Sequence, residues 1–219
     1  MITQAIEDYL KIIYKLSSGQ NNKSVSTNAV AECMSVTQAS VTGMMKKLFD
    51  LNLIDYKRYH GVTLTEAGEK IALEILRHHR LLELYLAEAL GFSWDKVHAE
   101  AEKLEHHISE EFEEKIAELL GHPLFDPHGA PIPTKDGFVP KRNLQTLTLA
   151  AVGSTVFVQQ VIDEEPEVLR YLGNLGVYPG CEIKVLGKAP FSGPLKIQIA
   201  GAEYHLGEKL TNQIFIEAT

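Results

Sequence analysis

The sequence predicts a mainly α-helical protein with a small β domain at its C-terminal end. Apolar residues recur at helical spacing through most of residues 1–120. Residues 122–140 then hold five of the nine prolines, which is typical of an extended linker. After this linker, apolar and polar residues alternate as they do in strands. The predicted domains are residues 1–64, 65–140 and 141–219.

Composition excludes several classes of protein. Apolar residues make up 45% of the chain and charged residues 23%, which is ordinary for a globular protein and excludes general disorder. No run approaches the roughly 18 apolar residues of a membrane span. Acidic residues near the N-terminus argue against a signal peptide, and Cys33 and Cys181 match no disulfide or zinc pattern. We therefore expect a cytoplasmic protein that does not associate with membranes.

The first domain is predicted to be a winged helix-turn-helix. Residues 4–17 form a helix by their apolar stripe. Ser26 or Thr27 caps a short helix, and Thr37 caps a second one after a tight turn of about four residues. Residues 53–65 then indicate two short strands, which would form the wing.

The exposed face of the second helix suits the reading of DNA. Such a helix lies in the major groove with small and hydrogen-bonding side chains, and basic residues contact the phosphates. We expect Gln38, Ser40 and Thr42 to contact bases and the basic residues to contact phosphates. An alternative is a protein-interaction module with the same fold. The candidate DNA-binding residues are Thr37, Gln38, Ala39, Ser40, Thr42, Gly43, Lys46, Lys47, Lys57 and Arg58.

Two long helices and a barrel are predicted for the rest of the chain. A capping box of Thr65 with Glu69 begins a helix that ends at Gly91. A second helix is predicted from Asp95 to Leu120. The alternating segments after residue 141, interrupted by one short helix, predict an SH3-like β-barrel of about 70 residues.

Charge and histidine are concentrated in the middle of the chain. Residues 1–63 have a net charge of +2, residues 64–140 of −9 and residues 141–219 of −1. Seven of the nine histidines lie between His78 and His128. A mildly basic front and an acidic, histidine-rich middle indicate a division of labour between domains.

The middle region carries a candidate metal site. His79 and Glu83 are four residues apart and so share a helix face. His98 is followed by acidic or imidazole side chains at +4, +7 and +8, which are Glu102, Glu105 and His106. Imidazole and carboxylate stripes on two helices predict a divalent metal site. The alternative is a solvated acidic face. By helical phase His78 and His107 point to solvent, and His122 and His128 stay unassigned.

Enzymatic use of these residues is disfavoured. The sequence has no helical His-Glu-x-x-His motif, no glycine-rich phosphate loop and no Gly-x-Ser-x-Gly nucleophile elbow. We therefore predict that the protein is not an enzyme. A metal-dependent enzyme or a metal-storage module remains as a hypothesis of a different class, which would require turnover or storage of metal.

The order of these motifs resembles the diphtheria-toxin-repressor family of metal-dependent transcriptional repressors. The resemblance covers essentially the whole chain, and its most specific parts are the segments RHHRLLELYL, KVHAEAEKLEHHIS and HPLFDPHGAPIP. It implies an ancillary metal site of His79, Glu83 and His98, which Gln160 and Asp163 of the barrel complete. It implies a primary site made by Asp8, Glu102, Glu105 and His106.

The resemblance also bears on the metal. Iron-type members have Met and Cys at the positions of Asp8 and Glu102, so carboxylates replace both sulfur ligands here, as in manganese-type members. Hard oxygen donors suit Mn²⁺ better than sulfur does, so we expect Mn²⁺, with Fe²⁺ as the alternative. Lys11 stands where some short manganese regulators have a carboxylate, which favours two separated sites.

The resemblance further implies how such a protein works. It would bind a palindromic double-stranded DNA operator as a homodimer and control metal-uptake genes. The helices around 71–90 and 104–120 would form the dimer interface. Metal would favour the spacing of recognition helices that fits two half-sites. The remaining alternative is a winged-helix protein that binds DNA regardless of metal.

Overall fold

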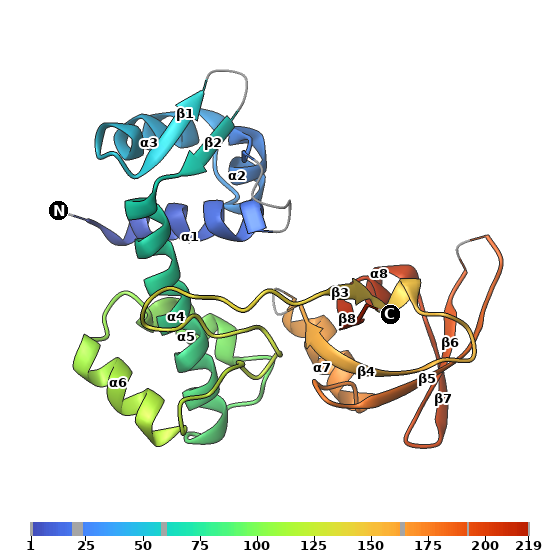
Figure 1. Ribbon diagram of the computed structural model, residues 1–219. Helices are drawn as coiled ribbons and strands as arrows, with labels where there is room; N and C mark the ends of the chain where they lie inside the picture. The colour runs from blue at the N-terminus through green and yellow to red at the C-terminus, as the bar shows by residue number, and fades with distance from the viewer. Residues whose placement is uncertain (1, 19–23, 58–60, 163–164, 192, 219) are drawn as a thin grey trace. The chain divides into compact units, whose positions relative to one another are not determined.

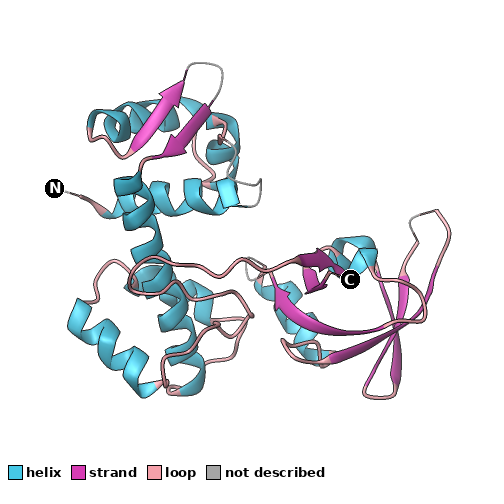
Figure 2. Cartoon of the chain, viewed as in Figure 1, coloured by secondary structure: helices cyan, strands magenta, loops and turns pink. Residues whose placement is uncertain are grey.

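A computed structural model describes residues 2–18, 24–57, 61–162, 165–191 and 193–218, and it confirms the mainly α-helical chain with a small β domain (Figures 1 and 2). The chain forms two compact units. The N-terminal unit holds residues 1–78, 105–108 and 133–138, and the C-terminal unit holds 79–104, 109–132 and 139–219. These two units do not correspond to the three predicted domains, so the division into three domains stays a prediction.

Most of the N-terminal unit is a helix-turn-helix with a two-stranded wing. Both predicted caps are confirmed, because Ser26 Oγ accepts a hydrogen bond from Ala29 N at 3.1 Å and Thr37 Oγ1 accepts one from Ser40 N at 3.2 Å. The wing strands pair antiparallel, with Ile54 opposite Leu64. The elements are α1 (Gln4–Ser18), α2 (Thr27–Cys33), α3 (Gln38–Asp50), β1 (Ile54–Lys57) and β2 (Gly61–Leu64).

One apolar core holds these elements together. Ile6 and Leu10 of α1 are fully buried, as are Val41 and Leu48 of α3 and Val62 of β2. Because α3 buries one face in this core, its other face is left exposed. The core therefore sets the orientation of the predicted DNA-reading helix within its unit.

The long helix α4 (Glu66–Glu88) begins directly after Thr65, which caps it as predicted. Thr65 Oγ1 accepts a hydrogen bond from Gly68 N at 3.2 Å. The capping box is only half formed, because Gly68 occupies the third helical position, where such a box needs a Glu or Gln side chain. Glu69 lies one residue too late for that role.

The single helix predicted for residues 95–120 is wrong. The chain forms α5 (Val97–Leu104) and α6 (Glu110–Leu119), with a break at residues 105–109. Ser109 accounts for the restart, because its Oγ accepts a hydrogen bond from Phe112 N at 3.2 Å and caps α6. Glu105 and His106 consequently lie in the break and not on a helix face.

The β domain, whose strands are magenta in Figure 2, contains a six-stranded antiparallel sheet with strand order β3-β8-β4-β5-β6-β7. Its buried core includes Val158, Leu169, Ile183, Ile197 and Ile216. Its elements are β3 (Leu144–Thr146), η1 (Leu147–Leu149), β4 (Thr155–Val161), α7 (Pro166–Asn174), β5 (Glu182–Lys188), β6 (Leu195–Ile199), β7 (Ala202–Leu206), α8 (Glu208–Thr211) and β8 (Ile214–Glu217). None of the helices described in the structure combines the length and the apolar character that a bilayer-spanning helix needs.

A turn of the proline-rich segment packs closely on β4 within the C-terminal unit. Val161 N donates a hydrogen bond to His128 O at 2.9 Å. Arg142 donates to Gly129 O at 2.8 Å and to Gln159 Oε1 at 2.6 Å. Gly129 has a φ of +85°, and a Cβ at this position would lie 2.1 Å from the carbonyl oxygen of Gln159. This contact therefore requires glycine.

We expect Gly129→Ala to destabilise this packing strongly. Gly153→Ala is the matched control, because Gly153 has a φ of +88° but no atom within 4 Å of its Cβ position. The control should lose about 1 kcal/mol from the left-handed φ alone, and Gly129→Ala about 1–3 kcal/mol more from overpacking. Urea unfolding followed by the fluorescence of Trp94, which stacks on His128, measures both. Equal midpoints for the two variants would contradict the close contact.

Candidate metal centre

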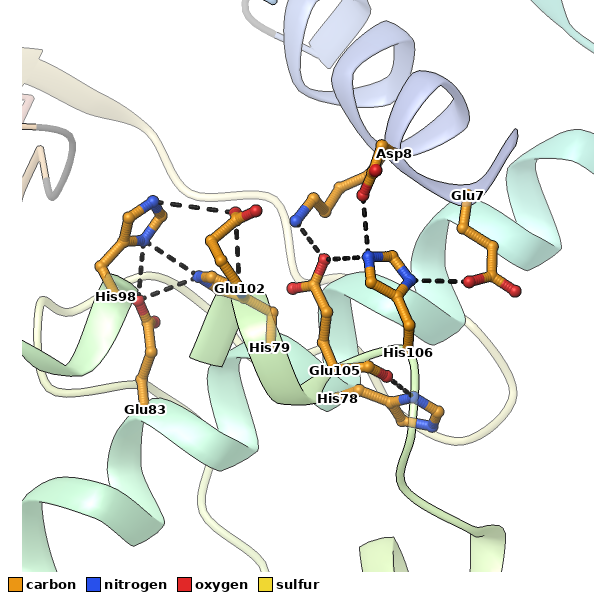
Figure 3. Close-up of polar contacts among 10 residues, drawn as sticks. Glu7, Asp8, His78, His79, Glu83, His98, Glu102, Glu105 and His106 are labelled. Carbon is orange, nitrogen blue, oxygen red and sulfur yellow. Dashed lines mark hydrogen bonds and ion pairs between the residues drawn. The ribbon is translucent and has the colours of Figure 1, made fainter. Parts of the chain in front are cut away.

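The first group of candidate ligands, the α4–α5 cluster, consists of His79, Glu83, His98 and Glu102. Helical spacing places His79 and Glu83 on one face of α4 and His98 and Glu102 on one face of α5 (Figure 3). His79 Nε2, His98 Nδ1 and Glu83 Oε1 lie 3.0 Å from one another on all three sides of a triangle. His79 and Glu83 are buried, with 1% and 0% of their surface exposed.

This triangle fits a divalent cation. One proton can lie along only one edge of the triangle at a time, whereas a cation meets all three lone pairs together. Three ligand atoms at about 2.1 Å from one ion and at right angles to each other are about 3.0 Å apart, which is the observed spacing. Imidazole and carboxylate donors suit borderline and hard divalent metals.

Glu102 lies with the α4–α5 cluster. Its Oε1 is 3.8 Å from His79 Nδ1 and 3.8 Å from His98 Nε2. The predicted stripe of four ligands on one helix is wrong, since α5 ends at Leu104 and only His98 and Glu102 share its face. The assignment of Glu102 to one site with Asp8 stays a prediction.

Two further candidate ligands, Asp126 and His128, come from the proline-rich segment. Together with Glu83 they form a buried group whose potential ligand atoms lie within 4.8 Å of one another. His128 Nε2 lies 2.8 Å from the carbonyl oxygen of Trp94, which can only accept, so Nε2 carries the proton. In the neutral ring Nδ1 then carries the lone pair, and it lies 4.0 Å from Glu83 Oε2. Metal-binding histidines are commonly held this way.

Sequence reasoning named neither residue as a ligand. The sequence periodicity gives no basis for assigning His128 or Asp126, because both lie in a loop with no periodic pattern. The one available signal was an acidic residue and a histidine two positions apart in the proline-rich segment. Asp126 also has a structural role, since its Oδ1 accepts hydrogen bonds from His128 N at 2.8 Å and Ala130 N at 2.9 Å.

The second group, the α1 cluster, consists of Asp8, Glu105 and His106 and lies within the N-terminal unit (Figure 3). His106 Nε2 lies 2.8 Å from Asp8 Oδ1 and 3.2 Å from Glu105 Oε1. On the other side of the ring, His106 Nδ1 lies 2.6 Å from Glu7 Oε2. Glu7, which the sequence reasoning missed, thus accepts the Nδ1–H and turns Nε2 toward the two carboxylates.

Charges around the α1 cluster partly balance. The Lys11 ammonium donates a hydrogen bond to Glu105 Oε1, and both side chains are buried. Burial raises the pKa of Asp8 and the charge of Glu105 adds to that effect, while His106 and Lys11 act in the opposite direction. His78 is 6% exposed and its Nδ1 lies 3.0 Å from the carbonyl oxygen of Glu105, so its predicted solvent orientation is wrong.

Of the two barrel residues expected as ancillary ligands, the structure describes Gln160 but not Asp163. Gln160 lies half-buried on β4, opposite Phe215, and among the described residues its side chain makes no hydrogen bond or ion pair. Asp163 lies outside the described residues. Their part in a metal site stays a prediction.

The candidate DNA-binding residues lie mainly on the exposed face of α3. Lys57 ends β1, and Arg58 lies outside the described residues. Polar or basic side chains thus cover the face of α3 that is opposite the core. The exposed members from Thr37 through α3 are Thr37, Gln38, Ala39, Ser40, Thr42, Gly43, Lys46 and Lys47.

A winged helix-turn-helix and two clusters of imidazole and carboxylate ligands together define a metal-dependent DNA-binding regulator. Family comparison agrees. Residues 1–62 match the iron dependent repressor N-terminal DNA binding domain, residues 65–134 its metal binding and dimerisation domain, and residues 145–218 the FeoA domain. The chain belongs to this family of metal-dependent transcriptional repressors, which are not enzymes.

Individual relatives include both manganese and iron regulators. The HTH-type transcriptional regulator MntR of Oceanobacillus iheyensis is 36% identical over 122 residues, which are 56% of this chain and 81% of that protein. The iron-dependent repressor IdeR of Mycobacterium tuberculosis is 28% identical over 214 residues, covering 92% of this chain and 91% of that protein. A manganese-dependent transcriptional repressor in complex with manganese has a TM-score of 0.89 at 36% identity, over 98% of this chain and 100% of that one.

We expect His79→Ala to lower the number of Mn²⁺ ions bound per chain by one, because it removes one corner of the 3.0 Å triangle. His107→Ala is the control, since His107 is exposed and belongs to neither cluster. Equilibrium dialysis with metal analysis gives the stoichiometry. An unchanged stoichiometry in His79→Ala would contradict a metal site in the α4–α5 cluster.

Proposed function

We propose that the protein is a manganese-activated transcriptional repressor that binds palindromic operators as a homodimer and controls metal-uptake genes. The α1 cluster is the observation that carries this proposal. It joins Asp8, on the first helix of the helix-turn-helix unit, to Glu105 and His106. These residues follow α5 directly in the chain, so the cluster links DNA-binding and dimerisation segments.

The residues of the α1 cluster give the proposal its mechanism. A divalent cation held by Asp8, Glu105 and His106 would offset the charge of the two carboxylates. Asp8 then restrains α1, while Glu105 and His106 restrain the segment between α5 and α6. Glu7 keeps Nε2 of His106 directed at the site. Metal binding would thereby favour the arrangement in which Asp8 lies beside Glu105 and His106. The size of this shift equals the difference in metal affinity between that arrangement and the others.

The α4–α5 cluster is proposed as the ancillary site. His79, Glu83 and His98 are its principal ligands, supported by their 3.0 Å triangle. Asp126 and His128 extend it on the other oxygen of Glu83. Because Val161 N of β4 donates a hydrogen bond to His128 O, this site would also hold the proline-rich segment against β4 within the C-terminal unit.

Exposed apolar side chains in the C-terminal unit support the homodimer. They lie in, or within four residues of, the segments around 71–90 and 104–120 that are expected to form the dimer interface. A twofold dimer would place two α3 helices at a fixed spacing, as a palindrome requires. Among the described residues of 90–124 they are Leu90, Phe92, Leu104, Phe112, Leu119 and Leu124, all between 39% and 68% exposed.

Manganese is proposed as the effector because of the donor atoms. Among the described residues, the candidate ligand groups contain only imidazole nitrogen and carboxylate oxygen. Such donors suit Mn²⁺, whereas thiolate and thioether ligands favour softer metals. The 36% identical structure with bound manganese adds support. Iron(II) is the second candidate, favoured by the whole-length likeness to an iron-dependent repressor.

We expect metal-dependent DNA binding that requires His106. DNA fragments from upstream of metal-transporter genes are titrated in Mn²⁺, in anaerobic Fe²⁺ and with chelator. His106→Ala removes the nitrogen that lies 2.8 Å from Asp8 and should weaken the Mn²⁺-dependent affinity by about 100-fold or more. His107→Ala should bind as the unaltered protein does. DNA binding that ignores both metal and His106 would instead indicate a metal-independent regulator.

We expect Asp8→Met to shift metal preference toward Fe²⁺, because a thioether replaces a carboxylate in the α1 cluster. The measurement is the ratio of the Mn²⁺ and Fe²⁺ concentrations that give half-maximal DNA binding. Asp8→Asn, which removes the charge but keeps an oxygen donor, is the control for lost charge alone. If both variants keep the unaltered ratio, the donor-atom argument for manganese fails.

A further inference from the structure

We propose that Lys11 is a built-in cation that competes with the activating metal for Glu105 and so sets the metal concentration at which the α1 cluster fills. This inference rests on the proposed function of that cluster. It concerns a residue that is not itself a metal ligand, since an ammonium has no lone pair to donate.

The first observation is the burial of the ion pair. The side chain of Lys11 is 3% exposed and that of Glu105 is 0% exposed. A lysine is almost never buried so completely unless it is paired. Lys11 lies on α1 one helical turn after Asp8, so its ammonium reaches the same carboxylate that lies beside His106.

The second observation is that a single oxygen atom of Glu105 contacts Lys11 and also faces the proposed metal position beside His106. Its Oε1 accepts the hydrogen bond from Lys11 Nζ and also lies 3.2 Å from His106 Nε2, on the side of the ring that faces Asp8. A divalent ion between His106 and Asp8 therefore has to share Glu105 with an ammonium or displace it. Sharing brings like charges to close range in a buried place, and displacement breaks a buried ion pair, so either lowers metal affinity.

The third observation is that Glu105 needs a cation in the absence of metal. A fully buried carboxylate without a partner is costly, and the ammonium of Lys11 relieves that cost. Removing the Lys11 charge should therefore have two opposite effects. The metal-free protein becomes less stable, while the metal-bound protein loses a repulsion. A lysine that serves only the packing of α1 predicts loss of both stability and metal affinity.

The test uses the full-length chain in a His79→Ala background, so that binding at the α4–α5 cluster does not obscure the α1 cluster. Lys11→Met keeps the length of the side chain and removes its charge. Lys15→Met is the matched control, because it makes the same change on the same helix one turn further on. Free Mn²⁺ is measured by electron paramagnetic resonance during titration, and thermal unfolding is followed with and without Mn²⁺.

We expect Lys11→Met to tighten the Kd for Mn²⁺ by at least about tenfold and to lower the Tm of the metal-free protein by about 5 °C or more. Lys15→Met and the charge-preserving Lys11→Arg should leave the Kd within about twofold of the background. If Lys11→Met does not fold, Lys11→Gln is measured with the same expectations.

Two outcomes overturn the proposal, and they are distinguishable. An unchanged or weaker Kd in Lys11→Met or Lys11→Gln, with normal binding in the background, shows that Lys11 is only structural. Failure of the His79→Ala background itself to bind Mn²⁺ removes the metal site of the α1 cluster, and the proposed function falls with it.

Discussion

A buried carboxylate needs a cation or several hydrogen-bond donors at contact distance, and this requirement organises the structure around Glu83 and Glu105. Both side chains are completely buried. Glu83 meets two imidazoles from α4 and α5, and Glu105 meets the ammonium of Lys11. The elements that carry these partners must therefore stay together for the protein to fold.

Features that depend on local spacing could be predicted from the sequence. The caps at Ser26, Thr37 and Thr65 follow from single hydroxyl side chains before apolar periodic segments, and all three form. The pairing of His79 with Glu83 needs only an unbroken helix, which α4 provides. Within these limits the helix-turn-helix, the wing, half of the α4–α5 cluster and the β domain could all be predicted from the sequence alone.

Features that depend on a helix break or on a loop could not be predicted in the same way. Helical phase carried past Leu104 placed Glu105 and His106 on one stripe with His98, whereas Ser109 restarts the helix and frees the preceding residues to meet α1. His78 lies on the unbroken helix α4, and helical phase alone put it in solvent because it could not show that the segment after α5 covers it; its Nδ1 lies 3.0 Å from the carbonyl oxygen of Glu105. Asp126 and His128 lie in a segment without periodicity, so only tertiary packing brings them to Glu83. Sequence periodicity therefore predicts which residues share a face only within one unbroken helix or strand.

The two clusters balance their charge by different means, and this makes them unequal as proposed metal sites. In the α4–α5 cluster the partners of Glu83 are imidazoles, which would have to be unprotonated at the ligating nitrogen to hold a metal, so metal binding there would compete with protons. In the α1 cluster the partner of Glu105 is an ammonium tethered to α1, which a metal has to displace or tolerate. Protons would therefore compete with metal at the α4–α5 cluster. At the α1 cluster both protons and the tethered ammonium of Lys11 would compete with metal. The fixed charge of Lys11 raises the metal concentration at which the α1 cluster would fill, in addition to the competition with protons that both clusters share. This difference favours the α1 cluster as the site that responds to metal concentration and the α4–α5 cluster as the site that supports the fold around it.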